Sequence, residues 1–352
     1  MWTRPRGVFP KTNATRRSRP TARSCLATPP ACGVLSAVNP SPGQILRVGV
    51  VGVGHIGKNH ARIYGELAAA VPDVQFSAIL DPNATVAAEI SAATGAKSVP
   101  SLDEFAAHVD AASISTPTPE HFEIAKHLLS QGKHLLIEKP ITETPEQARE
   151  LVALAKSAGV ILQVGHVERF NPALGALEKL LTRPRFIEAH RLSPYPMRST
   201  EIGVVLDLMI HDLEVILHLV RSPVAQVDAV GVPVLSRGED IANARVRFEN
   251  GCVANITASR VSPESLRKIR VFQNDAYLSL DYQAQTGECY RLVDGGIKKE
   301  TIEIEWDQPL KRQLQSFLES ARLGATPRVT GDQAAAALAL AVDITRMIAE
   351  QA

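Results

Sequence analysis

The sequence is poor in cysteine and has no long hydrophobic run. Its four cysteines, Cys25, Cys32, Cys252 and Cys289, lack the spacing of a metal site or a disulfide framework, which is typical of a reducing compartment. The most apolar stretch, residues 204–220, falls short of the roughly 20 uninterrupted apolar residues of a membrane span, because titratable side chains interrupt it. We therefore expect a cytoplasmic protein with no metal ion and no membrane partner.

Acidic residues are absent from the start of the chain. Residues 1–44 contain six arginines, one lysine and no acid, and the first acidic residue is Glu66. Without these seven positive charges the net charge of +1 becomes −6, so the remainder lacks the basic excess that nucleic-acid binding needs. An organelle transit peptide has this composition, and so does a disordered tail. We favour a dispensable or mis-assigned extension and exclude the leader from fold prediction.

The body of the chain has the length and composition of two folded domains. It belongs to a sequence of 352 residues, of which 45% are hydrophobic. Between residues 45 and 165, short apolar runs alternate with helical segments of about 10–15 residues, which predicts βαβ units and a parallel sheet. Beyond residue 165 strand-like runs dominate, and Asn250-Gly251 predicts a hairpin turn. We expect an α/β protein: a Rossmann domain at 45–165, then an α+β domain at 166–352 with a largely antiparallel sheet.

The expected elements follow from the same runs. In the first domain, strands are expected at 46–51, 74–80, 111–115, 134–137 and 160–164. In the second domain, they are expected at 186–192, 224–234, 242–248, 253–259, 268–272 and 276–281. The main helices are expected at 145–158, 172–181, 204–220, 309–323 and 332–350.

A glycine-rich turn follows the first expected strand. Gly52, Gly54 and Gly57 form a G-x-G-x-x-G pattern between a strand and a helix, which is the context of a dinucleotide site. The helix N-terminus would face a pyrophosphate. Asp81, at the end of the next strand, would accept hydrogen bonds from ribose hydroxyls and repel a 2′-phosphate, so NAD is favoured over NADP. The alternative is a glycine-rich turn with an incidental aspartate.

A lysine and a polar stripe are the candidate catalytic groups. Lys139 follows a strand of the parallel sheet, at the edge where ligands bind; the alternative is a surface lysine in a turn. The helix expected at 204–220 is apolar almost all round and should be buried. Its polar residues Asp207, His211, Glu214 and His218 share one helical face, which predicts that they line a wet cleft. The alternative is an Asp–His pair that stabilises the helix.

These groups suit hydride transfer from an alcohol. His211 would act as the base for the hydroxyl proton. Asp207, one turn earlier, would orient His211 and stabilise its imidazolium. Lys139 would polarise the substrate oxygen, while NAD accepts the hydride.

The chain resembles the glucose–fructose oxidoreductase/inositol dehydrogenase/rhizopine catabolism (Gfo/Idh/MocA) family over residues 45–352. The resemblance rests on five motifs: VGVGHIG at 51–57, STPTPEH at 115–121, EKP at 138–140, GHVERFNP at 165–172 and LDLMIHDLE at 206–214. It implies a Rossmann domain, an open-faced sheet used for homodimer or homotetramer formation, and a cis Lys139–Pro140 peptide. Met209 and Asp212 depart from the family's usual small residues, which leaves the shape of the sugar pocket open.

The resemblance also implies the site residues. The catalytic set is Lys139, Asp207 and His211. The cofactor-binding set is Gly52, Gly54, His55, Ile56, Gly57, Asp81, Ser115, Thr116, Pro117, His121, Glu138 and Lys139. The substrate-binding set is Lys139, His166, Arg169, Asn171, Tyr195, Arg198, Asp207 and His211.

Within the family, the segments around 165–172 and 191–212 resemble dehydrogenases that oxidise the 3-hydroxyl of a UDP-N-acetylhexosamine for amino-sugar and glycan synthesis. Arg169, Arg191 and Arg198 would receive the diphosphate, and Tyr195 would contact the uracil or the sugar. The alternative for each arginine is a surface charge. Two other functions stay open: an inositol or other polyol dehydrogenase, and a non-enzymatic NAD-sensing regulator.

Overall fold

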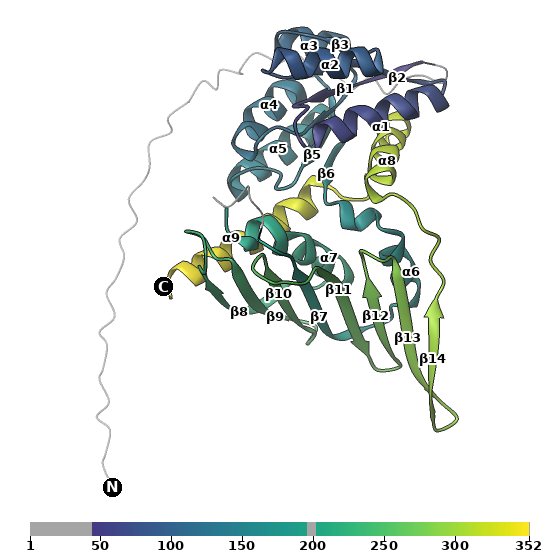
Figure 1. Cartoon of the computed structure of the whole chain (residues 1–352), viewed down its shortest axis with the longest axis vertical. Helices are drawn as coiled ribbons and strands as arrows, with labels where there is room; N and C mark the ends of the chain where they lie inside the picture. The colour runs from purple at the N-terminus through teal and green to yellow at the C-terminus, as the bar shows by residue number, and fades with distance from the viewer. Residues whose placement is uncertain (1–43, 196–201, 352) are drawn as a thin grey trace, which may run out of the picture. The chain divides into compact units, whose positions relative to one another are not determined.

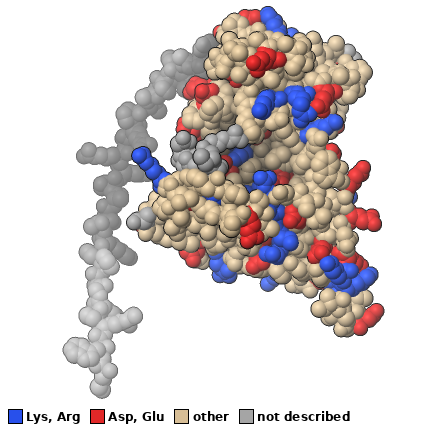
Figure 2. All heavy atoms as spheres, viewed as in Figure 1, with Lys and Arg blue, Asp and Glu red and all other residues tan. Residues whose placement is uncertain are grey.

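The computed structural model describes residues 44–195 and 202–351, which lie within one compact unit of the chain. The leader up to residue 43 and Arg198 lie outside the described residues. In the part of the chain that the structure describes, none of the helices has both the length and the apolar character needed to cross a bilayer. On the face seen in Figure 2, positive and negative side chains are interspersed.

A six-stranded parallel sheet forms the first half of the described chain (Figure 1). Its strand order is β3-β2-β1-β4-β5-β6, so the order reverses between β1 and β4, where such sheets bind nucleotides. The strands are β1 (Leu46–Val51), β2 (Val74–Leu80), β3 (Lys97–Ser98), β4 (Ala111–Ile114), β5 (His134–Glu138) and β6 (Leu162–Gly165). The helices are α1 (Gly57–Ala70), α2 (Ala84–Thr94), α3 (Leu102–His108), α4 (Thr118–Ser130) and α5 (Pro145–Ala158).

The predicted Rossmann architecture is confirmed. Every predicted strand of this half is present with ends within two residues of expectation. The central strands are buried on both faces, which is why they read as continuous apolar runs. The short β3 and α3 were not predicted, because β3 has only two residues, both exposed.

An eight-stranded sheet forms the second half, in the order β14-β13-β12-β11-β7-β10-β9-β8. Only β7 and β10 pair in parallel, so the predicted largely antiparallel sheet is confirmed. Its strands are β7 (Pro184–Leu192), β8 (Val224–Val232), β9 (Ile241–Phe248), β10 (Val253–Ser259), β11 (Leu266–Gln273), β12 (Ala276–Asp281), β13 (Thr286–Val293) and β14 (Gly296–Ile302). Strands β13 and β14 were not predicted, since β14 is polar and buries only Ile302.

Helices cover one face of this sheet. A 3₁₀ turn (Val167–Phe170) and α6 (Pro172–Leu180) follow β6, and α6 contacts β12, while α7 (Ile210–Val220) contacts β7 and α9 (Gly331–Ala349) contacts β8. Helix α8 (Pro309–Leu323) instead packs beside α1 (Figure 1). Leu314 and Phe317 of α8 are buried in one cluster with β1 and α1. Helix α8, near the C-terminus, therefore packs against the Rossmann core, although the predicted boundary at residue 165 assigns it to the second domain.

The helix predicted at 204–220 is present over that range, but its first part is not a regular α-helix. Residues Val205–Met209 form a π-helix, and the α-helix begins only at Ile210. The wider π-turn changes the rotation between residues on either side of it. Three of the four polar residues have different partners: Asp207 contacts Lys139, Glu214 contacts Arg169, and His218 contacts Glu178.

Candidate active site

The glycine-rich turn joins β1 to α1 at the point where the strand order reverses. Gly52 has φ +82°, and a Cβ there would lie 2.9 Å from the backbone nitrogen of Thr116. A Cβ on Gly57 would lie 1.8 Å from the carbonyl oxygen of Gly52. Both glycines are therefore required by the packing of the turn itself, as a conformation with positive φ and a close backbone approach demand.

Gly54 differs from these two glycines because nothing lies within 4 Å of the position of its missing Cβ. The open space beside the backbone suits the approach of a pyrophosphate. Helix α1 has no side-chain N-cap, so its first N–H groups can serve an anion. Ser115 Oγ and Thr116 Oγ1 are buried and have no hydrogen-bond partner among the described residues. The residues around this turn therefore fit a dinucleotide.

Asp81 at the end of β2 holds the turn in place. Its Oδ2 accepts a hydrogen bond of 2.7 Å from the backbone N–H of Val53, and its Oδ1 accepts one of 2.8 Å from Asn83. The aspartate is therefore part of the glycine-rich turn and not incidental to it. The partly exposed carboxylate has acceptor capacity left for ribose hydroxyls.

Lys139 follows β5 and reaches across to the second half of the chain. Its Nζ lies 2.7 Å from the carbonyl oxygen of Asp207 and 3.1 Å from Asp207 Oδ1. Both side chains keep some exposure, 20% and 30%, so the pair borders on solvent and is not a sealed ion pair. The Lys139–Pro140 peptide is cis, as the resemblance implied. Lys139 is thus held by tertiary contacts, unlike a surface lysine in a turn.

His211 lies at the start of α7, beside a second histidine. Its ring is edge-on to that of His166, with 6.1 Å between the ring centroids. The His211 side chain is partly exposed, but its Nδ1 is buried and has no partner among the described residues. Burial of the ring, followed by the charges of Lys139 and Arg191, lowers the pKa of His211 well below its usual value. The imidazole is therefore neutral and able to accept a proton at neutral pH.

His166 is the more deeply buried of the two rings. Both of its ring nitrogens lack a partner among the described residues, and burial together with Lys139 lowers its pKa to about 3. No hydrogen bond between Asp207 and His211 is found among the described contacts; Asp207, within the π-turn, accepts hydrogen bonds from the ammonium group of Lys139. The predicted role of Asp207 in orienting His211 stays a prediction.

Glu138 connects the strand that carries Lys139 to two helices. Gln313 of α8 donates a 3.0 Å hydrogen bond to Glu138 Oε1, and His60 Nε2 of α1 lies 3.2 Å from the same oxygen. A Cβ on Gly165 would lie 2.4 Å from this oxygen, so glycine is needed there. Burial raises the pKa of Glu138, but His60 and Gln313 outweigh that effect and lower it. The carboxylate was predicted to bind cofactor, whereas its contacts are with the protein scaffold.

His121 also belongs to the scaffold. One ring nitrogen lies 3.0 Å from the carbonyl oxygen of Pro140 and the other 2.9 Å from that of Thr116. The ring is 1% exposed and joins the loops that follow β4 and β5. The polar atoms of His121 are therefore used inside the protein, and its predicted contact with the cofactor stays a prediction.

The arginines predicted to bind a diphosphate are buried in ion pairs. Arg169 is 2% exposed and lies 2.5 Å from Glu214, and Arg191 is 4% exposed and binds both oxygens of Asp212 at 2.8 and 3.1 Å. Arg191 also donates to Glu168. Carboxylates distant in the sequence thus pair with both guanidinium groups, and the predicted contacts with a diphosphate stay predictions. Nothing in the sequence marks such partners.

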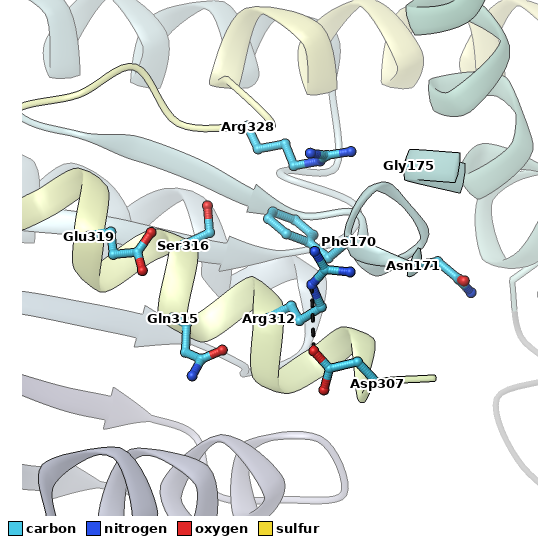
Figure 3. A pocket seen from close by; sticks show the side chains of 9 residues that line it. All are labelled: Phe170, Asn171, Gly175, Asp307, Arg312, Gln315, Ser316, Glu319 and Arg328. Carbon is cyan, nitrogen blue, oxygen red and sulfur yellow. Dashed lines mark ion pairs between the residues drawn. The ribbon is translucent and has the colours of Figure 1, made fainter. Parts of the chain in front are cut away.

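Asn171 also makes its polar contacts inside the protein, and its predicted contact with substrate stays a prediction. Its Nδ2 donates to the carbonyl oxygen of Tyr282, and its side chain caps α6. Figure 3 shows that Asn171 belongs to a separate cavity of about 310 Å³, which Lys139, Asp207 and His211 do not line. Its lining residues are Phe170, Asn171, Gly175, Asp307, Arg312, Gln315, Ser316, Glu319 and Arg328. Tyr195 is half-buried, and its predicted contact with substrate stays a prediction.

Comparison with known proteins identifies the family of the chain. Residues 46–166 match the oxidoreductase family described as having an NAD-binding Rossmann fold, and residues 178–279 match the GFO/IDH/MocA C-terminal domain. The chain belongs to the GFO/IDH/MocA family. As a GFO/IDH/MocA protein it is an oxidoreductase, with NAD as its cofactor.

Individual relatives agree with this assignment. UDP-N-acetylglucosamine 3-dehydrogenase of Acidithiobacillus ferrooxidans is 38% identical over 282 residues, which cover 78% of this chain and 88% of that enzyme. A solved structure of that enzyme has a TM-score of 0.82 and 36% identity, covering 86% of this chain and 97% of the other. The scyllo-inositol 2-dehydrogenase (NAD(+)) of Bacillus subtilis is 25% identical over 313 residues, which cover 81% and 89% of the two chains.

Proposed function

We propose that this GFO/IDH/MocA oxidoreductase catalyses the NAD-dependent oxidation of the 3-hydroxyl of a UDP-N-acetylhexosamine, as a step toward amino sugars of lipid A or other glycans. One observation carries the proposal. Lys139, at the end of β5 in the sheet that carries the glycine-rich turn, contacts Asp207 and acts on His211, in a chain 38% identical to a UDP-N-acetylglucosamine 3-dehydrogenase.

Three residues perform the chemistry in this proposal. His211, kept neutral by its surroundings, accepts the proton of the substrate hydroxyl. The ammonium of Lys139 stabilises the negative charge that develops on the substrate oxygen. Asp207 fixes Lys139 through its carbonyl oxygen and its carboxylate. NAD, when bound, supplies the hydride acceptor.

The cofactor is held by the turn and the neighbouring strand ends. We assign the pyrophosphate to Gly52, Gly54 and Gly57 with the N-terminus of α1, where His55 and Ile56 lie. Asp81 binds the adenosine ribose. Ser115, Thr116 and Pro117 line the opposite side of the turn, and the buried hydroxyls of the first two gain partners there.

The decisive assay incubates the full-length protein with NAD and UDP-N-acetylglucosamine and follows the absorbance of the reduced cofactor. We expect the wild type to turn over the nucleotide sugar. We expect the His211→Ala substitution to lower kcat about 10²–10⁴-fold and to leave the Kd for NAD unchanged. The matched control is His218→Gln on the same helix, whose ring faces Glu178. Wild-type turnover in His211→Ala would contradict the assignment of the base.

A polyol dehydrogenase is the second candidate, supported by the 25% identity to scyllo-inositol 2-dehydrogenase (NAD(+)). In the same assay, turnover of myo- or scyllo-inositol without turnover of the nucleotide sugar would establish it.

We also propose that the protein acts as a cytoplasmic homodimer or homotetramer through the uncovered face of the eight-stranded sheet. That face carries a ladder of aromatic rings across β7, β11, β12 and β13. The rings are Phe186, Phe272, Tyr277 and Tyr290, with centroids 4.8–5.7 Å apart. The rings are half-buried, and aromatic groups are enriched at protein interfaces. Light scattering of the purified protein measures the molar mass directly.

A further inference from the structure

Arg169 and Arg191, which were predicted to bind phosphate, form internal ion pairs. A third arginine, Arg267, lies on the same face of the sheet as Arg191. Arg267 lies in β11, directly opposite Arg191 of β7 in an antiparallel pair. Opposite residues of such a pair point to the same face of the sheet. Arg191 points to α7, where it binds Asp212, so Arg267 also points to the helix-covered face.

Arg267 is more exposed to solvent than its neighbours on that face. Ile269 and Val271, the next two residues of β11 that point the same way, are fully buried, whereas Arg267 is exposed. The helix layer therefore leaves an opening to solvent at this end of the sheet. Within the described part of the chain, the guanidinium of Arg267 makes no hydrogen bond or ion pair.

The opening lies close to the segment that carries the base. Arg191, opposite Arg267, binds Asp212, the residue that follows His211. Burial is the main cause of the lowered pKa of His211, and the charge of Arg267 adds to the same effect. In Asp212, whose pKa is raised by burial, Arg267 acts in the opposite direction. Arg267 is thus within electrostatic reach of the base.

We propose that Arg267 binds the diphosphate of a nucleotide-diphosphate sugar in this active site. The inference rests on the proposed function and names a residue for its substrate. A guanidinium group that is exposed, unpaired among the described residues and one strand away from the arginine bound to Asp212 matches the planar, bidentate recognition of phosphate oxygens. Arg169 and Arg191 have the same side chain but already bind carboxylates.

The competing explanation is that Arg267 only balances the buried carboxylates Glu168 and Asp212. Arg191 already donates hydrogen bonds to both of them, at 3.0 Å and at 2.8 and 3.1 Å. Arg267 donates to neither among the described contacts, and its side chain stays in water. A counter-ion role therefore does not explain why Arg267 lies at the opening.

The test compares the wild type with Arg267→Ala and Arg267→Lys. Steady-state kinetics with UDP-N-acetylglucosamine gives kcat and KM, and calorimetry gives the Kd for UDP alone and for NAD. We expect Arg267→Ala to raise the KM for the nucleotide sugar and the Kd for UDP about 10- to 100-fold, the usual effect of losing a charge-assisted hydrogen bond. Arg267→Lys should lie between, since it keeps the charge without the bidentate geometry. Binding of NAD should be unchanged.

Lys268→Ala is the matched control, because Lys268 is the next residue and points to the opposite face. It removes one positive charge from the same strand and should leave the KM and the Kd for UDP at wild-type values.

The outcomes separate this inference from the proposed function. A lower Tm in Arg267→Ala with an unchanged KM and Kd for UDP would establish a counter-ion and overturn the inference, while wild-type turnover would still support the function. Binding of UDP that depends on Arg267, without oxidation of UDP-N-acetylglucosamine, would support the inference and refute the sugar. A wild type that binds neither UDP nor the nucleotide sugar would refute both.

Discussion

The ammonium group of Lys139 lies 2.7 Å from the backbone carbonyl oxygen of Asp207 and 3.1 Å from its carboxylate. This contact joins the end of the parallel sheet to a π-turn beside the antiparallel sheet. It places a fixed positive charge near His211 and lowers the pKa of that histidine. Two hydrogen bonds thereby connect the parallel sheet to the π-turn that precedes the base.

Replacing Lys139 should therefore change both the rate and its pH dependence. We expect Lys139→Gln to lower kcat about 10²–10³-fold, because a donor to the developing negative charge is lost. Lys139 lowers the pKa of His211, so its removal raises that pKa. Activity needs the neutral base and is lost as pH falls through its pKa, so the acid limb of kcat/KM should move to higher pH. A slower variant with an unmoved acid limb would contradict the coupling; Lys133→Gln, in the connection between α4 and β5, is the control.

The glycines of the turn should respond differently to the same substitution. Gly54→Ala places its methyl group in open space, so the free energy of unfolding should change by less than about 0.5 kcal/mol. Its Kd for NAD should rise at least about tenfold, because the backbone can no longer approach the pyrophosphate. Gly57→Ala meets the carbonyl oxygen of Gly52 and should cost about 1–3 kcal/mol of stability. Urea unfolding and calorimetric titration with NAD measure the two effects, and equal losses of stability would contradict this division.

Gln313 should act on the reaction from a distance. Its side-chain amide donates to Glu138, and its backbone carbonyl oxygen accepts a hydrogen bond of 3.1 Å from Gln163. Gln313→Ala should cost about 1–3 kcal/mol of stability, since buried polar groups lose their partner. It should also lower kcat about tenfold by releasing the strand end that carries Lys139, with little change in the KM for substrate. Gln315→Ala, on the more exposed side of α8, is the control. A loss of stability with unchanged kcat would make Gln313 purely structural.

The Rossmann half was predictable because its signals are local. Strand β1 and helix α5 have the predicted ends, since an apolar run before Gly52 and a capping box at Thr144 each act within a few residues. The polar strand β14 and the π-turn at Val205–Met209 carry no such signal. Their conformation depends on pairing with β13 and on contacts made by the neighbouring helices.

The sequence by itself determined the dinucleotide turn, the two kinds of sheet and the residue types Lys139, Asp207 and His211. It did so because turn conformation and strand periodicity are properties of short segments. Only the tertiary structure decided which charges remain available to a ligand. Arg169 and Arg191 are matched by Glu214 and Asp212, whereas Arg267 is not, and ion pairing in a buried layer depends on partners that lie far apart in the chain.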